Sequence, residues 1–340
     1  MRNTTLAELA RKAYGAGYRL VAPLMGFPGV EMIGSSIKIA QQNFGEHYKA
    51  VRRLVDAFAP DAVFPLMDLA VEANALGRYT IFPKDESATV PKDHFGPGDL
   101  ERLSGINITF DSRLLGYVET VKMMSVTLPP GILRGAYVTG PFTLAGLMMG
   151  ADDVAMATID DPAGLNALCH FTTERIQEYV QLLIAAGADL IVVLEPTAVM
   201  LSPEQFAGFS AVYVRHLTES FRFSGVDFVY HTCGNTMHLV DGMVRSGVAG
   251  ISLDSRDAGV DLPAVARVVP PEVVVIGNIN PATIMLSGTP EEIRREVSGL
   301  LAAMTPFPNY VLSTGCDLPQ ETPVANIQAF MDAGRAWRRG

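Results

Sequence analysis

The stretch DPAGLNALCHFTTERIQEYVQLLIAAGADLIVVLE, residues 161–195, is a long helical pattern that ends in glycine and runs directly into an apolar strand. The same alternation continues along the chain in both directions. Eight nearly continuous apolar runs, separated by helical patterns, predict a parallel (β/α)8 barrel of the TIM type. These candidate strands are residues 18–24, 61–66, 135–140, 188–195, 227–232, 249–254, 272–278 and 309–315. An open doubly wound sheet is the alternative, but no GxGxxG follows the first strand to indicate a dinucleotide fold.

Length and composition agree with one large globular unit. We expect residues 1–340 to form a single barrel domain, because such barrels accommodate this length with insertions. Hydrophobic residues make up 49% of the chain and charged residues 18%, which favours a large core over disorder. The segment from Gly77 to Ser125 is too long and proline-rich for a simple connection. We expect it to be an insertion that covers the barrel mouth.

Charge and hydropathy exclude several classes of partner. A net charge of -10 argues against binding to a phosphate backbone, so nucleic acid is not an expected partner. No run approaches 18 consecutive apolar residues, and the N-terminal MRNTTLAELARKAYG is an amphipathic helical pattern without a signal-peptide core. The sequence therefore predicts a cytoplasmic protein that does not associate with membranes.

Two of the three cysteines stand at matching places in the pattern. His231 and Cys233 in VYHTCGNT, and Cys316 in LSTGCDLP, each follow an apolar strand at a small-residue turn. If these ends converge, one imidazole and two thiols suit Zn²⁺, and three protein ligands leave a fourth position open for substrate. The alternative is that the cysteines are small buried hydrophobic residues. Cys169 lies beside His170 in a helical pattern, where adjacent side chains chelate poorly, and is expected in the core.

The active site of such a barrel is built at the carboxyl ends of the strands. Nearly every candidate strand here ends in a group that could bind or react. Apart from the three metal-ligand candidates, the residues at these ends are Met25, Gly26, Phe27, Pro28, Asp68, Gly140, Pro141, Phe142, Thr143, Glu195, Asp254, Asn278, Asn280 and Asp317.

The motifs HTCGNT, GPFTLAG, PLMDLAVEANALG, ISLDS and STGCDLPQETPVANIQAF resemble the uroporphyrinogen decarboxylase superfamily. They are most similar to its zinc-dependent branch, the methylcobamide:coenzyme M methyltransferases and related corrinoid methyltransferases. The resemblance extends from about residue 20 to residue 334. It implies that His231, Cys233 and Cys316 are zinc ligands. The decarboxylases carry an arginine pair after the first strand, whereas no arginine occurs here from Leu20 through Val51.

The resemblance also suggests roles for other strand-end residues. The candidate catalytic residues are Glu195 and Asp254. Glu195 could be a fourth zinc ligand or a base for the thiol proton, or else a carboxylate stabilised by a helix N-terminus. Asp254 could hydrogen-bond His231, as metal-bound histidines usually require, or simply form a turn. Asp68 is a pocket candidate or a helix cap, and Met25, Gly26, Gly140, Phe142 and Thr143 are candidates for contacts to the corrinoid or substrate.

The implied activity is methyl transfer from a methylated corrinoid, methylcobalamin, to a thiol such as coenzyme M. The chain has no DxHxxG cobalamin motif, so the corrinoid is expected on a transient partner protein. Residues 25–31, 77–125 and 140–143 are expected to form its docking rim. The alternatives are a decarboxylase of a smaller carboxylated substrate and a non-catalytic binding relative.

Overall fold

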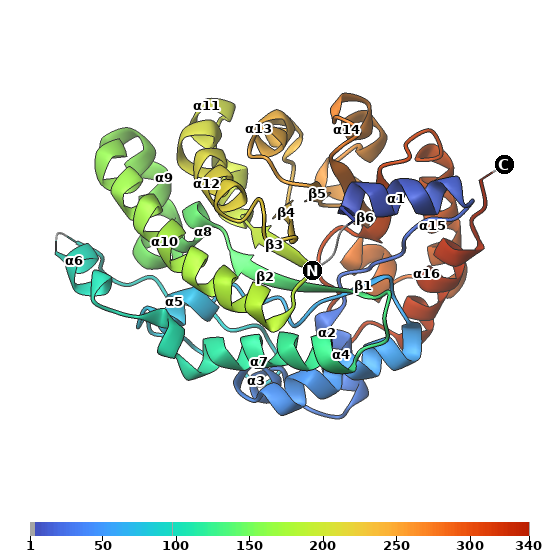
Figure 1. Ribbon diagram of the computed structural model, residues 1–340, viewed down its shortest axis with the longest axis horizontal. Helices are drawn as coiled ribbons and strands as arrows, with labels where there is room; N and C mark the ends of the chain where they lie inside the picture. Colours follow the sequence, from blue (N-terminus) through green and yellow to red (C-terminus); the bar gives the residue numbers. More distant parts are fainter. Residues whose placement is uncertain (1–3, 97, 340) are drawn as a thin grey trace.

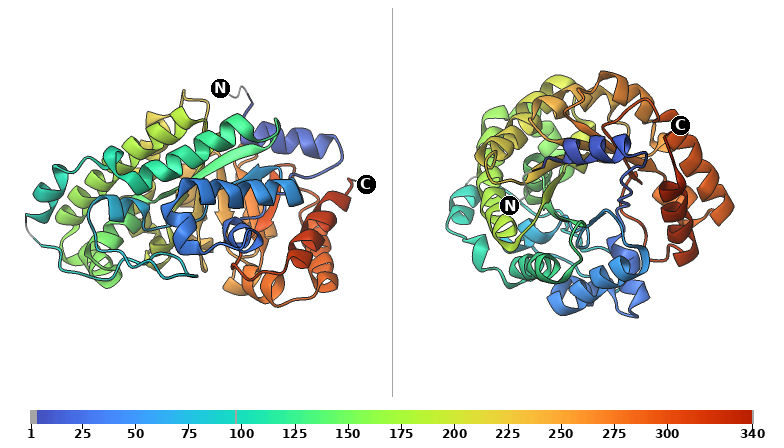
Figure 2. Two further views of the ribbon diagram at one scale, coloured as in Figure 1. Left: turned by 90° about the horizontal axis from the view of Figure 1, so that it is seen from below. Right: turned by 45° about the vertical axis from the view of Figure 1, so that its right-hand side comes forward.

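The structure is a computed structural model that describes residues 4–96 and 98–339. Its centre is a sheet of seven parallel strands in which each strand pairs with the next along the chain (Figure 1). Figure 2 shows that the elements follow one another around a ring in chain order, with helices on the outside. The predicted TIM-type architecture is confirmed. The strands are β1 (Ala62–Val63), β2 (Leu133–Thr139), β3 (Leu190–Leu194), β4 (Asp227–Thr232), β5 (Gly250–Leu253), β6 (Val274–Ile279) and β7 (Tyr310–Thr314).

The first expected strand, residues 18–24, is not a regular strand. Val21 makes only an isolated parallel bridge to Leu312 of β7. On the edge that faces β1, the Val21 N–H donates to Asp61 Oδ2 at 2.7 Å. On the β7 edge, the Leu24 N–H donates to the side chain of Thr314, at Oγ1, at 3.0 Å. The backbone N–H of Asp61 in turn donates to Val21. This irregular segment therefore joins β7 to the chain entering β1 and closes the ring.

Local capping chemistry defines several helix ends. Thr5 and Glu8 form a capping box at the start of α1, and Thr289 does the same with Glu292 at α15. The longest helix, α10, begins at the Asp161 cap and ends at Gly187, whose φ of 103° suits glycine. The α-helices are α1 (Leu6–Gly15), α2 (Gly26–Met32), α3 (Ile37–Gln42), α4 (Phe44–Phe58), α5 (Val71–Ala75), α6 (Asp99–Ser104), α7 (Ser112–Thr127), α8 (Pro141–Met149), α9 (Ala151–Asp160), α10 (Pro162–Ala186), α11 (Pro203–Phe206), α12 (Val212–Ser220), α13 (Val240–Arg245), α14 (Leu262–Val268), α15 (Pro290–Ala303) and α16 (Val324–Ala336). Short 3-10 or π turns are η1 (Ile108–Phe110), η2 (Pro196–Met200), η3 (Ala207–Ala211), η4 (Met237–Leu239), η5 (Arg256–Ala258) and η6 (Pro281–Leu286).

The predicted insertion at residues 77–125 is shorter than expected. Its last part is the regular helix α7, which packs against α4, α10 and β2 as a barrel helix does. The irregular part precedes α7, and its described residues contain α6, η1 and a bridge between Ile81 and Thr89. Lys92 pairs with Asp153 at 2.9 Å, which places this part beside α9.

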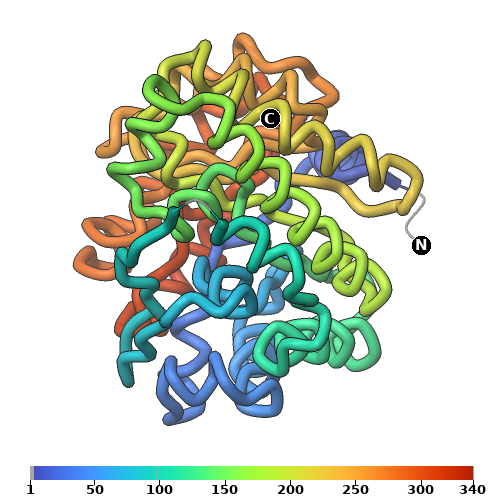
Figure 3. The backbone as a smooth tube through the Cα atoms, turned by 90° about the vertical axis from the view of Figure 1, so that its left-hand side faces the viewer, coloured from blue at the N-terminus to red at the C-terminus, as the bar shows by residue number. Residues whose placement is uncertain are grey.

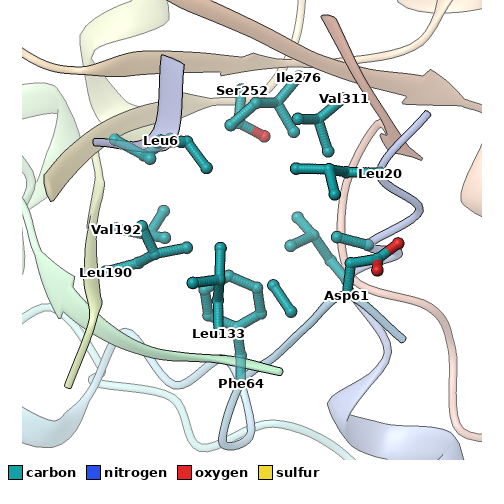
Figure 4. A pocket seen from close by; sticks show the side chains of 14 residues that line it. Leu6, Leu20, Asp61, Phe64, Leu133, Leu190, Val192, Ser252, Ile276 and Val311 are labelled. Carbon is teal, nitrogen blue, oxygen red and sulfur yellow. The ribbon is translucent and has the colours of Figure 1, made fainter. Parts of the chain in front are cut away.

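The end of the barrel at which the strands begin is apolar and closed. Leu6 of α1 packs there with inward-facing side chains such as Leu133, Leu190 and Val311, around a cavity of about 30 Å³ (Figure 4). Figure 3 shows α1 beside the yellow segment that leads into β4, and the Leu6 N–H donates to Asp227 of that strand at 2.7 Å. The strand-end residues Glu195, His231 and Cys316 lie at the opposite end, where the strands finish.

No single helix among the described residues is long and apolar enough to cross a membrane. Helices α8 and α9 reach the length and apolar composition of a membrane span only when they are taken together, and the pair is bent by 107°.

Candidate metal centre

His231, Cys233 and Cys316 come together at the carboxyl end of the barrel. His231 is the penultimate residue of β4, Cys233 follows that strand directly, and Cys316 lies two residues after β7. Cys233 Sγ is 3.5 Å from His231 Nε2 and 3.5 Å from Cys316 Sγ, and Cys316 Sγ is 3.8 Å from His231 Nε2. Within the described residues, these three side chains are the one group of histidine, cysteine or acidic ligand atoms with metal-site spacing.

The spacing fits a tetrahedral zinc ion. Bonds of about 2.3 Å to sulfur and about 2.0 Å to nitrogen at tetrahedral angles place the ligand atoms about 3.5 to 3.8 Å apart. The imidazole is buried and both thiols are partly buried. The Cys316 thiol interacts with Cys233, which lowers the pKa of Cys233 and raises that of Cys316. A divalent cation would remove this opposition between the two thiols, because it binds both cysteines in the thiolate form.

The second nitrogen of His231 is held by Ser252, and not by Asp254 as the sequence suggested. His231 Nδ1 is 3.0 Å from Ser252 Oγ, and the two residues face each other in the β4–β5 register. Asp254 instead accepts the N–H of Gly234 at 2.7 Å. It therefore positions the turn that follows Cys233. Sequence reasoning missed Ser252, although it is the polar residue in an otherwise apolar strand.

Glu195 caps helix α8 rather than pointing at the metal ligands. Its carboxylate accepts the N–H groups of Phe142 at 3.0 Å and Thr143 at 2.8 Å, together with the hydroxyls of Thr143 and Ser210. Burial raises the pKa of Glu195 to about 6, although these hydrogen bonds oppose the rise. All four acceptor positions of the carboxylate are filled. The expected roles as zinc ligand or base are therefore not supported, and the alternative, a carboxylate at a helix N-terminus, is what the structure shows.

The same capping accounts for three expected pocket residues. A Cβ at Gly140 would lie 2.1 Å from Glu195, so glycine is needed for the close approach. The N–H groups of Phe142 and Thr143 are already engaged by that carboxylate. Gly140, Phe142 and Thr143 thus build the helix start and offer no free backbone donor to a corrinoid.

Asp68 belongs to a buried ion pair. It accepts hydrogen bonds from Arg113 and from the Tyr117 hydroxyl, the latter at 2.7 Å, and both donors come from α7. Its other oxygen accepts the Ala70 N–H at 2.9 Å, just before α5. Sequence reasoning missed Arg113, which lies 45 residues away in the chain. Asp68 therefore ties α7 to the end of β1, and its carboxylate is not free.

Met25 and Gly26 lie next to the loop that carries Cys316. The Gly26 N–H donates to Asp317 Oδ1 at 2.9 Å, as does the Leu318 N–H. Met25 is 3% exposed. Burial raises the pKa of Asp317 to about 7, while N–H groups including that of Met67 oppose the rise. This carboxylate connects the irregular first segment to the metal ligand beside it.

Fold and site together define a parallel β/α barrel with a His-Cys-Cys cluster at the carboxyl ends of its strands. The chain belongs to the uroporphyrinogen decarboxylase (URO-D) family, whose model matches residues 31–337.

Its relatives include proteins with two different activities. A methylcobamide:CoM methyltransferase of Methanosarcina acetivorans is 26% identical over 71% of this chain and 68% of its own length. A uroporphyrinogen decarboxylase of Anaeromyxobacter dehalogenans is 27% identical over 95% of this chain and 91% of its own length. The solved structure of a methyltransferase from Methanosarcina mazei superposes with a TM-score of 0.84 at 21% identity, covering 98% of both chains. The structural likeness establishes the fold.

Proposed function

We propose that this protein is a zinc-dependent methyltransferase that moves a methyl group from a methylated corrinoid to a thiol. The observation that carries the proposal is the convergence of His231, Cys233 and Cys316 at tetrahedral spacing. A methyltransferase among the relatives supports it. Zinc bound by these residues would lower the pKa of an added thiol and supply a thiolate at neutral pH.

The reaction balances without an external oxidant or reductant. The thiol proton leaves to solvent, and the thiolate sulfur forms a bond to the methyl carbon. The carbon–cobalt bond breaks with its electron pair left on cobalt, which gives cob(I)alamin and a thioether. Ser252 fixes the orientation of His231, and Asp254 holds the turn after Cys233, so both act on the geometry of the ligands.

Metal analysis tests the ligand assignment. We expect about one zinc per chain in the wild type, and a sharp loss in both Cys233→Ala and Cys316→Ala. Cys169→Ala is the matched control, because Cys169 is buried in α10 outside the cluster. Full zinc content and full activity in both ligand variants would overturn the assignment.

A decarboxylase is the second candidate, because a decarboxylase is also among the relatives. No arginine occurs from Leu20 through Val51, and the Met25 side chain in this region is buried. Losing paired charge contacts to buried carboxylates costs on the order of several kcal/mol each. We therefore expect no conversion of uroporphyrinogen to coproporphyrinogen, while methylcobalamin is demethylated by one or more members of a thiol panel. The opposite pair of results would favour the decarboxylase.

We further propose that the corrinoid is delivered by a transient partner protein. The expected docking rim needs correction, because residues 25–30 and 140–143 are buried and offer no surface to a partner. At equal concentration, a methylated corrinoid protein should react far faster than free methylcobalamin, since reaction needs the methyl carbon within about 3 to 3.5 Å of sulfur. Equal or slower rates with every carrier tested would contradict a protein partner.

A further inference from the structure

Tyr137 of β2 lies one layer beneath the metal ligands, inside the barrel. Its Cα is in register with Val192 of β3, and Val192 is in register with Val229 of β4. Val229 precedes His231 by two residues on the same inward-facing side of β4. The phenol therefore belongs to the floor of the candidate metal centre.

The Tyr137 hydroxyl is buried and has no hydrogen-bond partner within the described residues. The hydroxyls of three other buried tyrosines have one: that of Tyr117 donates to Asp68, that of Tyr230 pairs with Ser210, and that of Tyr310 donates to the Gly277 carbonyl. Leaving a buried hydroxyl unpaired is costly, and such groups in folded proteins usually have a role.

The ring of Tyr137 is held in place. It stacks on Phe64 with centroids 5.1 Å apart and an interplanar angle of 24°. Phe64 also lines the apolar end of the barrel (Figure 4). Gly135 makes room for Phe64, because a Cβ there would lie 1.9 Å from its ring. The direction of the Tyr137 hydroxyl is thus set by packing before any ligand arrives.

The groups around the Tyr137 hydroxyl keep it protonated, so that it remains a hydrogen-bond donor. Burial raises the pKa of Tyr137 well above its ordinary value, and the charges of Asp317 and Cys316 raise it further. The O–H therefore stays protonated, and it is bonded neither to the Cys316 sulfur nor to the Asp317 carboxylate.

We propose that the Tyr137 hydroxyl donates a hydrogen bond to the sulfur of the methyl-accepting thiol in the metal centre. This inference rests on the proposed function. Two cysteinates already balance a divalent cation, so an added thiolate leaves an excess negative charge. A fixed donor under that sulfur stabilises the thiolate form, and hydrogen bonds to a charged acceptor are the stronger kind.

The test uses the full-length protein with Co²⁺ in place of Zn²⁺. Thiolate binding is then followed by the sulfur-to-cobalt absorption band, without any methyl transfer. The probes are 2-mercaptoethanol and 2-mercaptoethanesulfonate. For Tyr137→Phe we expect unchanged cobalt content, thiol affinity weaker by about 10-fold or more, and a shift of thiolate binding to higher pH.

Tyr310→Phe is the matched control. It removes a buried hydroxyl of the same kind, but one whose partner is the Gly277 carbonyl. We expect lower stability and unchanged thiol affinity. Equal thiol binding by wild type and Tyr137→Phe would overturn the inference, as would a loss of cobalt with thiol affinity unchanged, which would assign the hydroxyl to the metal ligands. If the wild type binds no thiol at all, the proposed function itself fails.

Discussion

At the scale of single residues, the site depends on how the chain orients one imidazole. His231 can present Nε2 to a metal only if the other ring nitrogen is held, and Ser252 Oγ lies 3.0 Å from it. A hydroxyl is a modest partner compared with a carboxylate, because it carries no charge. It still fixes the ring orientation and the tautomer.

Removal of that hydroxyl should weaken metal binding. We expect Ser252→Ala to lower zinc affinity by about 10- to 100-fold, measured by competition with a chelator, while the barrel stays folded. Ser246→Ala is the matched control, because its buried hydroxyl donates to the Met243 carbonyl in α13. If both variants keep wild-type zinc affinity, Ser252 does not position His231.

At the scale of elements, two buried glutamates connect barrel strands to neighbouring segments in different ways. Glu195 meets fixed backbone donors on both oxygens, from Phe142 and Thr143. Glu72 meets the backbone N–H and the hydroxyl of Thr139, each at 2.8 Å. That hydroxyl can rotate and donate instead to the Leu69 carbonyl, 3.0 Å away. Of these two sites, only that of Glu72 can therefore accommodate the side-chain amide of a glutamine in place of the carboxylate.

Glu195→Gln should destabilise the protein without removing the metal. Its amide N–H₂ must face one of the backbone N–H donors at the start of α8, which leaves a buried group unpaired. We expect a loss of about 2 to 4 kcal/mol in urea unfolding and unchanged zinc content. Loss of zinc from a fully folded variant would restore the role of Glu195 as a metal ligand.

Glu72→Gln should be tolerated, and its effect should depend on pH. Burial raises the pKa of Glu72 to about 7, above its value in the unfolded chain. The folded state therefore binds the proton more tightly, so the carboxyl group destabilises the fold above pH 7, and this penalty is relieved as the pH falls towards 4.5. Relative to wild type, the variant should gain about 2 kcal/mol between about pH 5 and about pH 8. A pH-independent difference would show that Glu72 is not charged in the fold.

At the scale of the whole molecule, the two ends of the barrel differ. The end at which the strands begin is plugged by Leu6, which is 2% exposed, and by the apolar side chains around it. The opposite end holds the metal ligands, the buried carboxylate of Glu195 and the carboxylates of the partly exposed residues Asp254 and Asp317. The first end contributes stability, and the second is available for chemistry.

Leu6→Ala should separate these two contributions. We expect it to cost about 2 to 4 kcal/mol of unfolding free energy, because it opens a cavity next to the existing one. Zinc content and thiol binding should remain at wild-type levels. Leu9→Ala, on the same helix but only partly buried, should cost less. A combined loss of stability and metal would show that the ends of the barrel are coupled.

Local patterns in the chain were sufficient for much of the fold and for the three metal-ligand candidates. An apolar run ending at a small-residue turn is a short-range signal, so β4 and β7, and with them His231, Cys233 and Cys316, could be placed from residues beside them. The capping pattern at α15 is equally local. The end of the barrel that carries the site followed from the direction of the strands.

What the tertiary structure alone decided is which groups the polar side chains meet. Glu195 caps a helix that begins 54 residues earlier, and Asp68 pairs with Arg113 across 45 residues. Residues 18–24 do not form a regular strand, because the side chains of Asp61 and Thr314 accept the N–H groups of Val21 and Leu24. The buried His47 accepts the N–H of Leu66, which lies 19 residues further along the chain. Hydrogen bonds are short-ranged and directional, so their partners are determined only once packing has brought distant segments together.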